Sequence, residues 1–167
     1  MTEEFTWPER DASKGAWFGS PELKAWVLAK MIQHRAWDEI IQGDYQTPSD
    51  TPSGHRGCLI GCTLPKGAYY PDGFGYMVPG VGFVDGTGTR EDDVERLYGI
   101  PYEVGSLMER TFEHHEFDVA AEFAVASIEA IPAGMVYRRE VLGELDEWQP
   151  HGVSDVLAFL ETGEVEA

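Results

Sequence analysis

The second half of the sequence is divided into short segments by residues that begin and end helices. Thr89 is a favourable helix N-cap, Gly99 is a typical helix end, and Pro101 suits the first turn of the next helix. Pro132 ends a further, strongly apolar segment. The expected helical segments are REDDVERLYG, PYEVGSLMERTFEH, FDVAAEFAVASIEAI, GMVYRREVLGELDEWQ and VSDVLAFLETG, the last capped by Ser154.

The first half is expected to hold one longer helix. Ser-Pro-Glu at residues 20–22 combines a capping serine, a proline in the first turn and an acid at the positive end of the helix dipole. Apolar residues continue at helical spacing toward Gly43, with His34 on or beside the apolar stripe. We therefore predict a mainly α fold. It is a compact bundle of about six short helices in one domain, with residues 1–19 as an irregular arm.

A glycine-rich insertion over residues 65–90 separates the two helical parts. Phe74, Tyr76 and Val78 alternate with other residues before Pro79. This alternation predicts a small β-hairpin. The aromatic side chains of Phe74 and Tyr76 are candidates for contact with a protein partner. The more ordinary interpretation, which we favour, is that they fold back on the core.

Charge is spread unevenly along the chain. Residues 91–167 carry 19 acidic and 4 basic side chains, out of a net charge of −18 for all 167 residues. Binding to nucleic acid is not expected, because phosphate contacts need Lys and Arg. The acidity can serve solubility, attract a basic protein, or imitate a nucleic-acid backbone. The acidic candidates for partner contact are Glu140, Glu144, Asp146 and Glu147.

The chain lacks the features of an exported or membrane protein. No apolar run approaches the roughly 20 residues that cross a bilayer. The N-terminus MTEEFTWPERD is acidic and has no continuous apolar core, so no signal peptide is expected. We therefore expect a cytoplasmic protein whose two cysteines stay reduced.

Both cysteines lie in the stretch GHRGCLIGCTLP, residues 54–65. The favoured interpretation is that Gly57 and Gly61 allow another helix to approach, and that Cys58 and Cys62 are small buried apolar groups. No cofactor is then expected. The alternative is a zinc site with the ligands His34, His55, Cys58 and Cys62, although the cysteine spacing is unusual for zinc.

A thiol nucleophile is a further alternative at the same stretch. Cys58 would need a histidine such as His34 or His55 as its base, and Asp38 could orient His34 from one helical turn away. Cys58, His34 and Asp38 are therefore the catalytic candidates. They are three common residue types and form no motif, so a structural role is favoured for each.

Four segments together resemble a family of small uncharacterised bacterial and phage proteins with a central GCxxGCTL segment. These are MIQHRAWDEIIQGDY, RGCLIGCTL, ERLYGIPYEVGSLMERTFE and FAVASIEAIPAG, which occur in the same order over about two thirds of the chain. The matching positions are His34, Asp38, Glu39, Gly43, Gly57, Cys58, Gly61, Cys62, Thr63, Leu64, Gly99, Ile100, Pro101, Glu109, Phe112 and 130–132. The insertion and Tyr98 depart from the family pattern. The resemblance implies a fold and a phage or mobile-element origin, but no reaction.

Two functions of different classes follow from these features. The favoured one is an acidic interaction protein that binds, and inhibits, a basic or nucleic-acid-handling host protein, for example as an anti-defence or anti-CRISPR inhibitor or as a DNA mimic. The alternative is a thiol- or metal-dependent small enzyme, or a metal-binding protein, centred on His34, His55, Cys58 and Cys62. The sequence predicts no oligomeric state.

Overall fold

The computed structural model describes residues 6–64, 76–78, 82–84, 89–145 and 152–164, which form seven α-helices, two 3-10 helices and two short antiparallel sheets. The α-helices are α1 (Pro21–Ala36), α2 (Leu59–Thr63), α3 (Arg90–Tyr98), α4 (Tyr102–His114), α5 (Phe117–Ala130), α6 (Arg139–Glu144) and α7 (Val153–Thr162). The 3-10 helices are η1 (Ala12–Lys14) and η2 (Ala16–Gly19). The predicted mainly α fold is confirmed.

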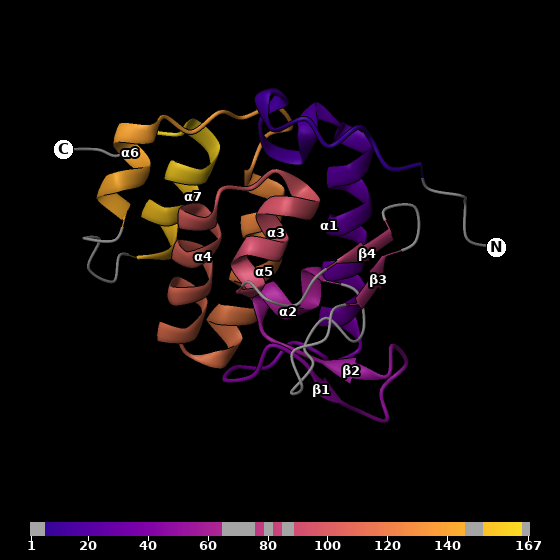
Figure 1. Cartoon of the computed structure of the whole chain (residues 1–167). Coiled ribbons are helices and arrows are strands. Elements are labelled where there is room, and N and C mark those ends of the chain that lie inside the picture. Colours follow the sequence, from indigo (N-terminus) through magenta and orange to yellow (C-terminus); the bar gives the residue numbers. More distant parts are fainter. Residues whose placement is uncertain (1–5, 65–75, 79–81, 85–88, 146–151, 165–167) are drawn as a thin grey trace.

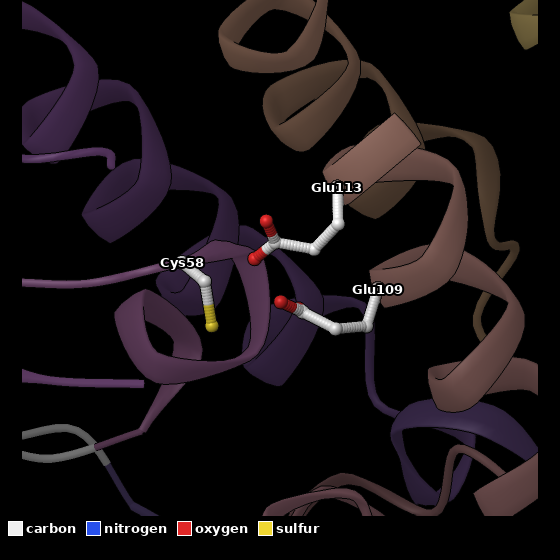
Figure 2. A group of neighbouring side chains, drawn as sticks. All are labelled: Cys58, Glu109 and Glu113. Atoms are coloured by element: carbon white, nitrogen blue, oxygen red, sulfur yellow. The ribbon is translucent and has the colours of Figure 1, made fainter. Parts of the chain in front are cut away.

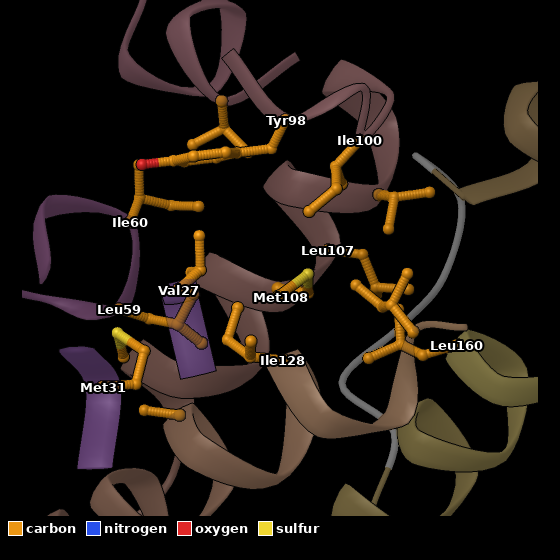
Figure 3. Close-up of a cluster of buried hydrophobic side chains, with 14 of the residues drawn as sticks. Val27, Met31, Leu59, Ile60, Tyr98, Ile100, Leu107, Met108, Ile128 and Leu160 are labelled. Atoms are coloured by element: carbon orange, nitrogen blue, oxygen red, sulfur yellow. The ribbon is translucent and has the colours of Figure 1, made fainter. Parts of the chain in front are cut away.

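The bundle is centred on α5, which packs against α1, α4 and α7. Figure 1 shows α1 on one side, α6 and α7 on the opposite side, and α3, α4 and α5 between them. No helix in the described part of the chain is both long and apolar enough to cross a membrane. The buried core between the helices includes Val27, Met31, Leu59, Ile60, Leu107, Met108, Ile128 and Leu160 (Figure 3).

Helix starts follow the capping signals in the sequence. The Ser20 hydroxyl accepts a hydrogen bond from the Leu23 N–H at 3.1 Å. Thr89 and Asp92 form a reciprocal capping box at the start of α3, and Gly99 ends that helix at φ +69°. These predictions are confirmed because local hydrogen bonds decide them. At α7 the N-cap is Gly152, and Ser154 lies inside the first turn.

The end of α1 differs from its prediction. The helix ends at Ala36, seven residues before Gly43. Trp37 leaves helical geometry, and Asp38 takes a positive φ of 57° that reverses the chain. The reversal turns Glu39 inward, where it is fully buried. A tertiary contact of Glu39 therefore overrides the helical pattern that the sequence continues.

Two hairpins lie beside the bundle. Strands β3 (Tyr76–Val78) and β4 (Gly82–Val84) pair with Met77 opposite Phe83, which confirms the predicted hairpin. Strands β1 (Thr47–Pro48) and β2 (His55–Arg56) pair within a stretch expected to be a loop. This second hairpin brings residues 53–55 back to the end of α1.

The segment before α1 is held against the end of α5. The Trp17 indole is fully buried and donates to the Ile131 carbonyl at 3.0 Å. The Ala16 N–H donates to the Met135 carbonyl at 2.9 Å, and the Gly134 N–H donates back to Ala16 at 2.8 Å. These bonds hold residues 16 and 17 against the segment that follows α5.

Candidate metal centre and a neighbouring polar network

The two glycines of the cysteine segment make room for the loop that contains Tyr45. A Cβ atom added to Gly57 or Gly61 would overlap with the carbonyl oxygen of Tyr45. The Cys58 N–H donates to the Asp44 carbonyl at 2.8 Å in the same place. Close approach is thus the role of these glycines, as predicted, but the approaching segment is a loop and not a helix.

Cys62 is a buried packing residue. Its side chain is fully buried, and its thiol lies 3.3 Å from the Gly57 carbonyl oxygen. Burial, followed by the charge of Glu39, raises the pKa of this thiol to about 12. A thiol with so high a pKa stays protonated at neutral pH and is a poor nucleophile.

The carboxylate that contacts His34 is Glu39, whereas the sequence spacing predicts Asp38. His34 Nδ1 lies 2.8 Å from Glu39 Oε1, and both residues are buried. Asp38 is exposed. The reason for this correction is the early end of α1, because helical i to i+4 spacing no longer applies beyond Ala36.

Glu39 joins two segments of the chain, the end of α1 and the loop before β2, through its two carboxylate oxygens. The Ser53 N–H donates at 3.0 Å and the Ser53 hydroxyl at 2.6 Å. Burial by itself raises the pKa of Glu39, but hydrogen bonds from Ser53, Thr51 and His34 outweigh it and lower the pKa to about 2. This network fixes the loop before β2 to the end of α1.

The four predicted ligands His34, His55, Cys58 and Cys62 do not form one metal-binding group among the described residues. The rings of His34 and His55 are neighbours, with centroids 5.1 Å apart. Burial lowers the pKa of both imidazoles, so both are neutral at pH 7. Cys58 belongs instead to a different cluster.

That cluster consists of Cys58, Glu109 and Glu113. One ligand atom of each residue, the thiol sulfur or a carboxylate oxygen, lies within 4.8 Å of those of the other two. Cys58 is the N-cap residue of α2, and the two glutamates lie one turn apart on α4. Figure 2 shows both carboxyl groups extending from α4 toward the Cys58 sulfur. Cys58 is buried, Glu109 is half-buried and Glu113 is exposed.

Backbone hydrogen bonds hold both carboxylates in place. The Ile60 N–H, in the first turn of α2, donates to Glu109 Oε2 at 3.0 Å. The Gly43 N–H donates to Glu113 Oε1 at 3.1 Å. The Gln42 amide donates to the Phe112 carbonyl at 2.8 Å, which fastens this loop to the end of α4. Three segments therefore converge on the cluster.

The electrostatic environment of the cluster is acidic. Burial, together with the neighbouring Glu113 carboxylate, raises the pKa of Glu109 to about 7, against the opposing hydrogen bonds of Cys58 and Ile60. Burial and the charge of Glu109 raise the pKa of the Cys58 thiol far above its usual range. None of the described residues that line the adjoining hollow, of about 270 Å³, is basic. The three groups thus share a site without a balancing positive charge.

The candidate residues for partner contact are only partly described. Glu140 and Glu144 line a hollow of about 520 Å³ with Arg138, Val141 and Glu164. The backbone of Tyr76 lies in β3. Phe74, Asp146 and Glu147 lie outside the described residues.

Glu39, Glu109 and Glu113 have no site role predicted from the sequence. The i, i+4 spacing of Glu109 and Glu113 is a signal that could have drawn attention to them, because two acids one turn apart repel each other on a helix. Their approach to Cys58 depends on how α2 packs against α4, which the sequence pattern does not give. Comparisons with protein-family models, with curated proteins and with solved structures gave no match.

Proposed function

We propose that the protein binds one divalent transition-metal ion, with zinc as the best fit, through Cys58, Glu109 and Glu113. The observation that carries this proposal is the convergence of one thiol and two carboxyl groups within 4.8 Å of one another. Zinc accepts both thiolate sulfur and carboxylate oxygen as ligands. This proposal departs from the interpretation favoured by the sequence, in which no cofactor is bound and Cys58 is a packing residue.

The number of ligands suggests how the ion would be used. Three protein ligands leave one position of a tetrahedral ion open, as in catalytic zinc sites. The hollow beside the cluster, lined by Gly43, Asp44 and Tyr45, offers space for water or a small ligand there. A bound ion would lower the pKa of an attached water, which is the usual chemistry of such a site.

The charge arrangement supports the same proposal. Glu109 and the Cys58 thiol resist ionisation because each lies in a buried, acidic environment. A bound dication supplies the missing positive charge and favours the ionised form of all three groups. Metal binding should therefore release protons and weaken as the pH falls.

A purely structural role exists for Glu109 and makes a competing prediction. Its carboxylate accepts the Ile60 N–H and so caps the N-terminus of α2 from α4, since the N-cap residue Cys58 makes no side-chain capping bond. This role explains Glu109 alone. Glu113 accepts a separate backbone bond from the Gly43 N–H, so the metal proposal depends on both carboxyl groups reaching toward the same sulfur.

Nucleophilic catalysis by Cys58 is less well supported. A catalytic thiol needs a lowered pKa, and that of Cys58 is raised by burial and by Glu109. His34 is bonded to Glu39 and belongs to the other network. The thiol-enzyme alternative would therefore operate only through a bound metal.

The test is a calorimetric titration of chelator-treated protein with zinc at pH 7.5. We expect one zinc per chain, and binding weakened by more than about tenfold in Cys58→Ser and in Glu113→Gln. Glu113 is exposed, so its variant should fold even if Cys58→Ser does not. The matched controls Cys62→Ser and Glu129→Gln should bind like the wild type. An absence of binding, or equal loss in the controls, would refute the proposal.

A second candidate function is that of an acidic interaction protein in the cytoplasm, which binds a basic protein partner and no nucleic acid. The hollow with Glu140, Glu144 and Glu164 supports it, because its described lining residues include three acids and one arginine. In this function the chain would inhibit a nucleic-acid-handling host protein, as a phage-encoded anti-defence inhibitor or DNA mimic.

An arginine-rich peptide tests this second function by fluorescence anisotropy. Binding should weaken as salt increases and in the double variant Glu140→Gln/Glu144→Gln, because exposed charges are screened by salt. Glu129→Gln is the control. Affinity that is independent of salt and of these charges would speak against it.

A further inference from the structure

Large apolar side chains are exposed where α1 ends and α5 begins. The exposed fractions are 45% for Ile32, 36% for Trp37 and 43% for Phe117. Phe117 lines a hollow of about 360 Å³ together with Ile40 and Ala121. We call this region, made of Ile32, Trp37, Phe117 and the charged residues around the hollow, the α1–α5 surface.

Both α1 and α5 contribute side chains to the α1–α5 surface. Arg35 of α1 and Glu122 of α5 form an ion pair at 3.6 Å across the hollow. Ile32 precedes Arg35 by three residues, which places both on the same face of α1. The apolar side chains are thus presented by two packed helices.

The charges around the hollow are mainly negative. Asp38, Asp118 and Glu122 line it, and Arg35 is the basic residue among its described lining residues. An apolar, partly aromatic centre with a charged rim is the usual composition of a protein interface. The rim therefore selects a partner with basic residues around an apolar anchor.

We propose that the α1–α5 surface binds a basic amphipathic helix of another protein. An apolar side chain of that helix would enter the hollow beside Phe117, and its Lys or Arg residues would face Asp38, Asp118 and Glu122. A second copy of this chain is a poor occupant, since each copy has a net charge of −18. The proposal rests on the second candidate function and gives the basic partner a contact surface separate from the hollow lined by Glu140 and Glu144.

The test is an NMR titration of labelled protein with a helical peptide of leucine and lysine. We expect shifts at the amides of residues 32–41 and 117–122, and an affinity loss of more than about tenfold in Phe117→Ala. Asp118→Asn with Glu122→Gln should weaken binding and reduce its salt dependence. Val136→Ala, which removes another exposed apolar side chain, should have no effect.

Two peptide controls separate this proposal from general acidity. A matched peptide with serine in place of leucine should not bind, since it lacks the apolar anchor. Shifts confined to α6 and α7 would overturn the α1–α5 surface and leave the acidic interaction function intact. The absence of binding to either surface would overturn both. If the protein self-associates and Phe117→Ala abolishes the self-association, the occupant of the α1–α5 surface is a second copy of this chain, and the proposal is overturned.

Discussion

Replacement of Glu109 by glutamine should stabilise the metal-free protein at alkaline pH. The pKa of Glu109 is raised from 4.5 to about 7, chiefly by burial. Each pKa unit corresponds to about 1.4 kcal/mol, so ionisation in the folded state opposes folding by up to about 3 kcal/mol. Because Glu109 is only half-buried and coupled to its neighbours, we expect about 1–2 kcal/mol.

The pH dependence gives the sign of the effect. Below pH 4.5 the carboxyl is protonated in both states, and Glu109 does not reduce stability. Between pH 4.5 and about 7 the unfolded chain ionises first, so stability falls as the pH rises. Glutamine cannot ionise, yet its carbonyl oxygen can still accept the Ile60 N–H. The gain from Glu109→Gln should therefore be full above pH 7 and small near pH 4.5.

Urea unfolding monitored by tryptophan fluorescence, with a chelator present, measures this difference at pH 4.5 and pH 8. Added zinc should stabilise the wild type at pH 8 and stabilise Glu109→Gln less, since one ligand is lost. Glu129→Gln, on the exposed side of α5, should change stability by less than about 0.5 kcal/mol. Destabilisation by Glu109→Gln to the same extent at both pH values would refute this reasoning and favour a simple capping role.

Three further substitutions and one control, Gly143→Ala, test the fold by the same unfolding assay. Glu39→Gln should destabilise the protein by about 3 kcal/mol at pH 7, because it disrupts a buried charged network. The loss should shrink between pH 4.5 and about 2, where Glu39 itself becomes protonated. Gly61→Ala should destabilise by more than about 3 kcal/mol or prevent folding, since its Cβ overlaps with the Tyr45 carbonyl. Gly143→Ala, in α6 with open space around it, should be neutral or stabilising. Thr89→Ala should lose about 1 kcal/mol with the capping box of α3. A gain in stability from Glu39→Gln, Gly61→Ala or Thr89→Ala would contradict the structural role given to that residue.

The sequence predicts those elements whose formation depends on neighbouring residues. The starts of α1 and α3 follow from Ser20 and Thr89, since their side chains bond to the backbone within the next turn. The β3–β4 hairpin follows from alternation around Pro79. The end of α1 does not follow from neighbouring residues. Apolar residues continue at helical spacing, whereas Glu39 lies outside the helix and accepts a hydrogen bond from the Ser53 hydroxyl.

The candidate site is predicted only in part for a similar reason. Cys58 is recognisable as a candidate from its own segment, but His34 and His55, its candidate partners in the sequence, neighbour each other in the separate Glu39 network. Glu109 and Glu113, the partners of Cys58, lie about fifty residues further along the chain. In so acidic a sequence, two more glutamates carry little information. Their role depends on α2 packing against α4, which is a tertiary result.

The most direct test of the central claim is the absorption spectrum of the protein loaded with cobalt(II) in place of zinc. A cysteine thiolate bound to cobalt gives a charge-transfer band that carboxylate ligands do not give. We predict this band, at one cobalt per chain, in the wild type and in Cys62→Ser, and its loss in Cys58→Ser. A cobalt-binding protein without the band, or a band that survives in Cys58→Ser, would contradict metal binding at Cys58, Glu109 and Glu113.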